Sequence, residues 1–193
     1  MKKFVVAWLA ALWVLGASSS GLAEINGLAV AEAALSQVGV TKIYDPSYVK
    51  LDYPGGDVPL ERGVCTDVVV RALRKAGVDL QVLIHRDMRA NFKAYPQNWG
   101  LRGPDKNIDH RRVPNIVTYY QRQGRSLALP INKHRLKPGD LIAWMLPGNL
   151  PHIGVVSRVQ GDKVWLVHNI GLGAREEQVL EHWPITAHLR PLD

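Results

Sequence analysis

Hydrophobic residues in the first half of the chain recur every three or four positions, which is the spacing of one face of a helix. Four segments have this spacing: residues 25–38, 65–76, 80–92 and 113–123. Gly39, Gly77 and Gly124 directly follow the first, second and fourth of them, and glycine commonly follows the last residue of a helix. The pattern therefore predicts four helices before residue 124.

The second half changes to short apolar runs separated by turn residues. Three runs are predicted strands: residues 141–146, 152–159 and 163–169. A Lys-Pro-Gly-Asp turn at 137–140 precedes the first run, and Gly161-Asp162 separates the last two. We expect an α+β fold, in which N-terminal helices pack on a C-terminal antiparallel sheet.

The first 23 residues have the pattern of a secretory signal peptide. Lys2 and Lys3 precede fourteen uncharged residues at 4–17, and Ala23 marks the expected cleavage site. The apolar run is shorter than the roughly 20 residues of a membrane-spanning helix, although an uncleaved N-terminal anchor is the alternative. We expect an exported, periplasmic protein with no transmembrane segment after signal removal.

Removal of residues 1–23 would leave 170 residues, so 24–193 is predicted to be a single domain. Without Lys2 and Lys3, 22 basic residues stand against 17 acidic ones, a net charge of +5. Export argues against a nucleic-acid partner. The charge suits either an anionic polymer outside the cytoplasm or a solvated basic surface.

Cys65 is the only cysteine of the chain, so no internal disulfide can form. It stands at the predicted start of a helix, where free N–H groups and the helix dipole favour the thiolate. This makes Cys65 a candidate nucleophile. A buried cysteine that acts as a small hydrophobe is the structural alternative.

Two histidines lie in the predicted sheet. His152 begins one strand and His168 ends the next, so antiparallel pairing brings both to one end of the sheet. A thiol, an imidazole base and a second polar group form a cysteine version of the catalytic triad. We expect Cys65 as nucleophile, His152 as base and His168 as the residue that orients it.

Other polar residues are candidates for substrate contacts or for structure. Asp67 could bind a substrate ammonium, orient a catalytic group or cap the helix, and its charge would oppose a lowered thiol pKa. The loop at 41–63 contains Tyr44 and Tyr48, either of which could join the Cys65 N–H in binding an oxyanion. A cluster at 107–112 could bind carboxylates or begin the next helix; its candidate residues are Asn107, Asp109, His110 and Arg111.

The order of these motifs resembles the papain-like, NlpC-type cell-wall peptidase superfamily. The resemblance rests on the helix-starting cysteine, the segment 136–141, the His-Ile-Gly-Val-Val at 152–156 and the Val-His at 167–168. It implies a Cys65 nucleophile, a His152 base, an orienting His168 and cleavage of amide bonds in peptidoglycan stem peptides. An upstream tyrosine serves the oxyanion in that superfamily. Thr66-Asp67 replaces the usual Ser-Gly, and a long segment precedes His152.

Three motifs more closely resemble an exported bacterial family catalogued as domain of unknown function 1287. They are the Gly-Val-Cys-Thr-Asp at 63–67, the Asn-Ile-Asp-His-Arg at 107–111 and the His-Asn-Ile-Gly at 168–171, which adds Asn169 to the candidate site.

The resulting hypothesis is an exported cysteine amidase or endopeptidase that needs no cofactor or metal. An acyltransferase with the same Cys–His pair and a non-enzymatic wall-binding protein are alternatives. A zinc hydrolase is disfavoured, because the chain has seven histidines but neither a His-Glu-x-x-His motif nor a cysteine cluster.

Overall fold

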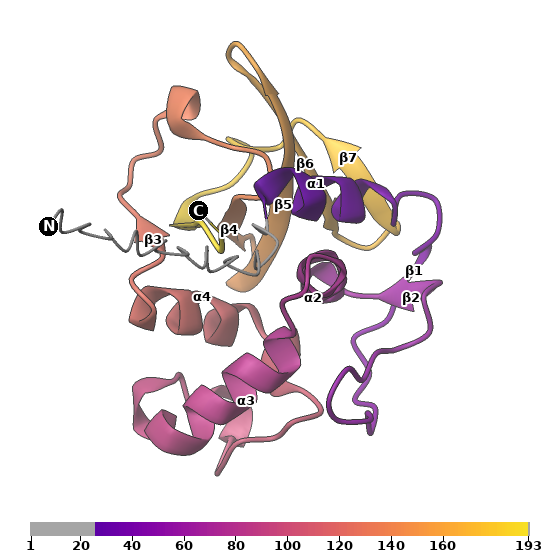
Figure 1. Ribbon diagram of the computed structural model, residues 1–193, viewed down its shortest axis with the longest axis vertical. Helices are drawn as coiled ribbons and strands as arrows, with labels where there is room; N and C mark the ends of the chain where they lie inside the picture. Colours follow the sequence, from indigo (N-terminus) through magenta and orange to yellow (C-terminus); the bar gives the residue numbers. More distant parts are fainter. Residues whose placement is uncertain (1–25, 193) are drawn as a thin grey trace, which may run out of the picture.

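The computed structural model describes residues 26–192, so the predicted signal peptide lies outside the described residues (Figure 1). The four predicted helices are confirmed, with ends that differ by one to three residues. They are α1 (Gly27–Leu35), α2 (Cys65–Lys75), α3 (Leu80–Asn91) and α4 (Val113–Arg122). Short 3-10 turns lie between them and before the sheet: η1 (Phe92–Ala94), η2 (Asn98–Gly100), η3 (Asp109–Arg111) and η4 (Lys133–Arg135).

The second half forms an antiparallel sheet of six strands in the order β3-β8-β4-β5-β6-β7. The predicted meander is its centre: β4 (Leu141–Leu146), β5 (Leu150–Gln160) and β6 (Lys163–Asn169). Strands β3 (Ser126–Leu127), β7 (Ala174–Glu177) and β8 (Ile185–Leu189) were not predicted. They are short and lack a long apolar run, so only their pairing with longer neighbours defines them as strands.

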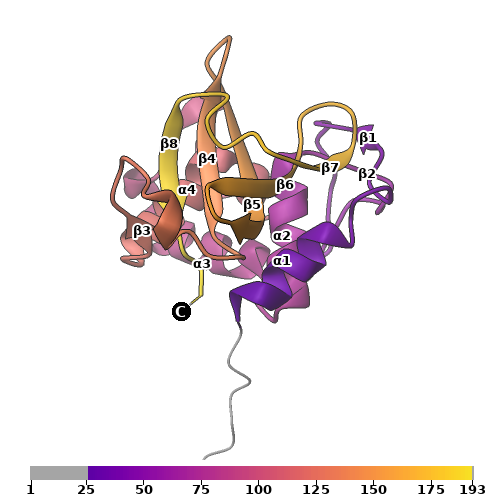
Figure 2. The same cartoon turned by 90° about the horizontal axis from the view of Figure 1, so that it is seen from above.

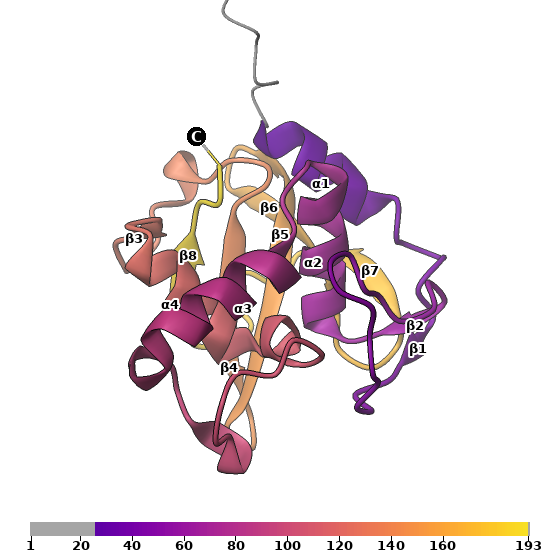
Figure 3. The ribbon, with the colours of Figure 1, turned by 60° about the horizontal axis from the view of Figure 1, so that its bottom comes forward.

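Both faces of the sheet are covered (Figures 2 and 3). Helices α1, α2 and α4 pack against the sheet on one face, and α3 packs on α2 and α4. Val68, Ile116 and Val155 belong to the buried cluster between these helices and the sheet. The segments around residues 131–136 and 179–185 cover the opposite face, which includes Trp144 and Leu166. The predicted α+β class, with helices packed on an antiparallel sheet, is therefore confirmed.

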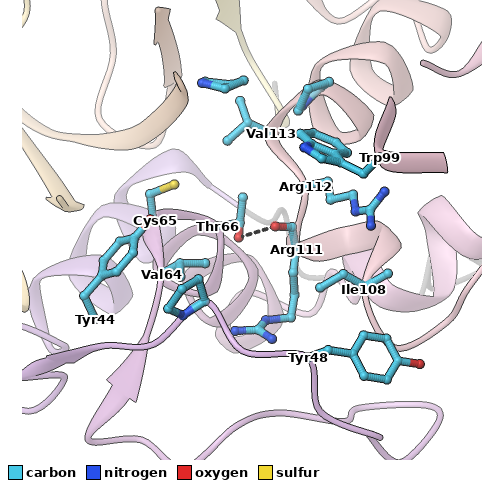
Figure 4. Close-up of a pocket in the computed structure, with 13 residues that line it drawn as sticks. Tyr44, Tyr48, Val64, Cys65, Thr66, Trp99, Ile108, Arg111, Arg112 and Val113 are labelled. Carbon is cyan, nitrogen blue, oxygen red and sulfur yellow. Dashed lines mark hydrogen bonds between the residues drawn. The ribbon is translucent and has the colours of Figure 1, made fainter. Parts of the chain in front are cut away.

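The long segment at 41–63 is ordered and carries a small parallel pair of strands. This pair joins β1 (Ile43–Tyr44) to β2 (Arg62–Gly63), immediately before α2. Thr41 accepts a hydrogen bond from Ala174 N–H through its carbonyl, which ties this segment to β7. The segment thereby holds Tyr44 beside the start of α2 (Figure 4).

Candidate active site

The chain enters α2 through a conformation that requires glycine at position 63. Gly63 has φ +154°, and a Cβ there would lie 2.9 Å from Asp67 Oδ2. The Asp67 carboxylate accepts the Val64 N–H at 2.7 Å, so it caps the helix that Cys65 begins. These contacts explain the Gly-Val-Cys-Thr-Asp motif at 63–67. Glycine leaves room for the capping carboxylate of Asp67, and the cap places Cys65 in the first turn of α2.

The Cys65 thiol lies beside β5 at the point where β6 ends. The β5–β6 ladder starts at Val155 and Val167, which leaves the Ile153 N–H outside it. That N–H instead donates to the Cys65 sulfur, and the N–H groups of Thr66 and Cys65 also stabilise the thiolate form. Cys65 is only 5% exposed.

Burial decides the protonation state of this thiol. It raises the pKa of Cys65 to about 12, with a further increase from the Asp67 charge, and the backbone N–H groups only partly oppose it. The N–H groups at the helix start favour the thiolate, as expected, but burial outweighs them in the protein without substrate. The opposing influence of Asp67 has the predicted sign.

The two histidines meet as predicted from the pairing of their strands. His152 Nε2 lies 2.9 Å from His168 Nδ1. Gly154 makes this contact possible, because a Cβ at that position would lie 3.1 Å from His168 Cβ and 3.3 Å from Trp144 Cζ3. Trp144 also stacks on His152, with ring centroids 5.7 Å apart, and restricts the orientation of the imidazole.

Glu177, on β7, completes this chain of polar contacts. Its Oε2 lies 3.1 Å from His168 Nε2. A carboxylate at that nitrogen favours the tautomer with the proton on His168 Nε2, so Nδ1 accepts from His152 Nε2–H and the lone pair of His152 is on Nδ1. Sequence reasoning missed Glu177, because β7 has no apolar pattern that would have placed it beside β6.

Burial keeps both imidazoles neutral. It lowers the pKa of His152 to about 3, with a smaller contribution from His168. Burial also lowers the pKa of His168, while Glu177 opposes that shift. His152 is therefore an unprotonated imidazole at neutral pH, which is the state that can accept a proton.

The two histidines contact each other directly. Cys65, by contrast, contacts Ile153, the residue that follows His152. Among the described residues, the hydrogen bonds of the thiol do not include one to the His152 ring. Cys65 and Pro151, the neighbour of His152 on the other side, line the same pocket. Cys65 therefore lines the pocket itself, whereas the buried histidine pair lies behind its wall, next to Pro151.

That pocket has a volume of 390 Å³, and its wall comes from the loop at 41–63, the start of α2, η2, η3, the start of α4 and β5 (Figure 4). Its lining has two arginines and no carboxylate: Tyr44, Pro46, Tyr48, Val64, Cys65, Thr66, Trp99, Ile108, Arg111, Arg112, Val113, Pro114 and Pro151. Arg112 belongs to the polar cluster at 107–112 that the sequence offered for carboxylate binding.

The two candidate tyrosines differ in their surroundings. The Tyr48 hydroxyl donates to Asp105 Oδ2 at 2.9 Å and accepts from Asn107 Nδ2 at 2.9 Å, so loop contacts already occupy it. Burial raises the pKa of Tyr44, as do the charges of Cys65 and Asp67. A protonated Tyr44 hydroxyl close to the sulfur is the better-placed donor of the two (Figure 4).

Asp67 and Arg111 form a buried, two-pronged ion pair. Arg111 Nε lies 2.8 Å from Asp67 Oδ1, and Arg111 Nη2 lies 3.0 Å from Oδ2. Arg111 also donates to the Ser47 carbonyl at 3.1 Å, and its own carbonyl accepts the Thr66 hydroxyl at 2.9 Å. All three nitrogens of the Arg111 guanidinium therefore donate hydrogen bonds within the protein. The ion pair and these bonds link the loop at 41–63 with η3 and α2.

Most of the polar cluster at 107–112 faces the interior. Asn107 accepts the Leu51 N–H at 3.0 Å, and Asp109 accepts the Asp105 N–H at 2.6 Å. Burial raises the pKa of Asp109 to about 6 and lowers that of His110 to about 4. These three residues are absent from the pocket lining.

Asn169 links the two halves of the candidate site. Its Nδ2 donates to the Gly63 carbonyl at 2.9 Å, and its Oδ1 accepts the Gly171 N–H at 3.1 Å. Because Asn169 follows His168 and Gly63 lies two residues before Cys65, this bond aligns the histidine strand with the cysteine helix.

Within residues 26–192, no three His, Cys, Asp or Glu side chains gather in a way that could hold a metal ion. None of the helices in this part of the chain has the length and hydrophobicity needed to cross a membrane.

The chain is thus an α+β protein with a cysteine at a helix start and a histidine pair on an antiparallel sheet. Comparison with known proteins identifies its family. Residues 31–191 match the model of the domain of unknown function DUF1287, so the chain belongs to that family. The Escherichia coli (strain K12) "Uncharacterized protein YijF" is 52% identical over 167 residues, which cover 86% of this chain and 82% of that protein.

A comparison with solved structures finds NlpC1 from Trichomonas vaginalis, at a TM-score of 0.46 and 11% sequence identity. The match covers 85% of this chain and 43% of that one, so the chain spans less than half the length of that protein.

Proposed function

We propose that this protein is an exported cysteine hydrolase that cleaves an amide bond in peptidoglycan stem peptides. The observation that carries the proposal is that Cys65, the only cysteine of the chain, begins a helix in the pocket wall and contacts Ile153, whose neighbour His152 lies 2.9 Å from His168. The NlpC-type motif order supports the choice of a peptide amide as the substrate.

In the proposed reaction, Cys65 Sγ attacks the carbonyl carbon while its proton passes to His152 Nδ1. The resulting imidazolium is stabilised by His168, whose far nitrogen faces the Glu177 carboxylate. His152 then protonates the leaving amine, and the C–N bond breaks. A water molecule, deprotonated by His152, hydrolyses the thioester and returns the thiol.

The oxyanion of the tetrahedral intermediate needs donors beside the sulfur. The Cys65 N–H lies in the first turn of α2, where helix N–H groups have no partner within the helix. We assign the second donor to the Tyr44 hydroxyl, because the Tyr48 hydroxyl is already bonded to Asp105 and Asn107.

Incubation of the protein lacking residues 1–23 with purified muropeptides, followed by mass spectrometry of the products, tests the proposal. Hydrolysis yields two fragments whose summed mass is that of the substrate plus one water, and Cys65→Ala yields none. If an added amine replaces water in the product, the protein is an acyltransferase. If no bond is cleaved while both proteins bind the muropeptides equally, the wall-binding alternative replaces the proposal.

Glu177 is expected to act as a positioning residue. In Glu177→Gln the amide can donate to His168 Nε2, which favours the wrong His168 tautomer and leaves Nδ1 unable to accept from His152. We expect kcat to fall about 10- to 100-fold with KM changed less than about threefold. Steady-state kinetics of the muropeptide cleavage provide the measurement.

Glu176→Gln is the matched control, because the neighbouring Glu176 bonds Ser157 and Arg158 rather than a histidine. It should retain kcat within about twofold. Equal losses in the two variants would assign Glu177 a merely structural role, whereas restored kcat in Glu177→Asp would support the carboxylate.

The pKa values of the two reacting groups predict a broad plateau in the pH profile. With the pKa of Cys65 raised to about 12 and that of His152 lowered to about 3, both caused mainly by burial, the reactive neutral forms predominate from pH 5 to pH 8. The value of kcat/KM should vary by less than about threefold over that range. Alkylation of the thiol by iodoacetamide should be slow at neutral pH and rise about tenfold per pH unit, without levelling off below about pH 10.

A fall in kcat/KM below about pH 6.5 would instead show that His152 titrates as an exposed histidine. Rapid alkylation at pH 6 would show a thiolate–imidazolium pair. Either result would contradict the neutral ground state described by the structure.

A further inference from the structure

Arg112 lies in the wall of the pocket across from Cys65, and its charge acts on the buried Asp109 without a direct ion pair (Figure 4). Of the two arginines in the lining, Arg111 is held by the Asp67 carboxylate. Arg112 forms no ion pair with any of the described carboxylates within 4.0 Å. Its Nη1 is buried and has no hydrogen-bond partner.

Trp99 fixes the plane of this guanidinium. Arg112 Cζ lies 4.7 Å from the centre of the Trp99 ring, the geometry of a cation–π contact. Trp99 remains 63% exposed and has φ +57°, a left-handed conformation that costs a non-glycine residue about 1 kcal/mol. The local backbone therefore holds a large aromatic side chain at the surface, under Arg112, rather than in the core.

The surroundings of Arg112 favour an anion. The pocket lining contains no Asp or Glu, and both α2 and α4 begin at it, through Cys65 and Val113. The positive ends of two helix dipoles therefore add to the Arg112 charge. Arg112 Nη1 has no hydrogen-bond partner, and Trp99 fixes the plane of the guanidinium. Both features suit a carboxylate, which accepts two parallel N–H bonds from a guanidinium.

We propose that Arg112, stacked on Trp99, is a carboxylate subsite that selects anionic peptide amides. The scissile carbonyl lies at Cys65 and a free carboxylate of the same substrate lies at Arg112, and Ile108 and Val113 add apolar side chains to the same pocket wall. This inference rests on the proposed function for the cleavage step but not for binding. Of the two arginines in the cluster at 107–112, it assigns carboxylate recognition to Arg112, because Asp67 already binds Arg111.

The test compares two synthetic stem-peptide fragments, one with free carboxylates and one in which these are carboxamides. Wild-type protein is expected to cleave the acid at least about 10-fold faster in kcat/KM, and Arg112→Gln should lose about 10- to 100-fold on the acid and less than about threefold on the amide. Arg112→Lys, which keeps the charge without the fork, should restore part of the preference. Arg86→Gln, an exposed charge change on α3 outside the pocket, should leave both rates within about twofold.

Calorimetric binding to the Cys65→Ala protein separates this inference from the proposed function. Tighter binding of the acid, lost in Cys65→Ala/Arg112→Gln, supports the subsite even if the wild type cleaves neither fragment. Cleavage of both fragments at equal rates, or an equal loss on both in Arg112→Gln, overturns the subsite while the hydrolase proposal stands.

Discussion

Cys65→Ala is expected to lower kcat/KM for stem-peptide cleavage by at least about 10⁴-fold, because without the sulfur no acyl-enzyme can form and His152 has no thiol to deprotonate. The fold should survive the change. Only the sulfur atom is removed from a buried position, which costs about 1 kcal/mol and lowers Tm by about 2–4 °C. Steady-state kinetics and thermal unfolding measure the two effects.

Val68→Ala is the matched control for this experiment. Val68 is fully buried in α2, three residues beyond Cys65, and packs in the helix-side core. Its truncation should cost about 2 kcal/mol, more than the loss of the sulfur, yet retain kcat/KM within about fivefold. Turnover by Cys65→Ala above one-tenth of the wild-type rate would exclude Cys65 as the nucleophile.

Arg111→Met is expected to lower the free energy of unfolding by about 3–5 kcal/mol, because it leaves the Asp67 carboxylate buried without its partner. The side chains of Arg111 and Asp67 are only 2% and 4% exposed, so water cannot replace the lost bonds. Asp67 also caps α2, so the start of the helix that positions Cys65 should be affected. Chemical denaturation, with the slope m as a check on two-state unfolding, provides the measurement.

Two variants make this prediction specific. Arg158→Met removes the exposed ion pair with Glu176 and should cost no more than about 1 kcal/mol. The double variant Asp67→Leu/Arg111→Met removes both buried charges and should be more stable than Arg111→Met alone. A cost for Arg111→Met no larger than that for Arg158→Met would show that the buried pair does not stabilise the fold.

The central elements of the fold could be predicted because their signals are local. The strands at 141–146 and 163–169 match their predicted ends, since a run of apolar residues bounded by turns defines them without reference to the rest of the chain. Strand β8, by contrast, lies between β3 and β4 in the sheet, far from its sequence neighbours. Pairing over such distances has no local pattern.

The candidate site divides in the same way. The meeting of His152 and His168 followed from antiparallel pairing and one turn, so sequence reasoning could anticipate it. Glu177 could not be found, because its role depends on which strand lies beside β6. The sequence also could not separate Arg111 from Arg112, because only the packed chain shows which of the two arginines a buried carboxylate neutralises.

The sequence alone thus determined the class of fold, the candidate nucleophile and the histidine pair, all of which depend on residue type and on periodicity over short distances. The tertiary structure decided which side chains are charged and which polar groups already have hydrogen-bond or ion-pair partners within the protein. Burial raises the pKa of Cys65, although its position at a helix start favours the opposite shift. Desolvation depends on everything that surrounds a group, which only the packed chain defines.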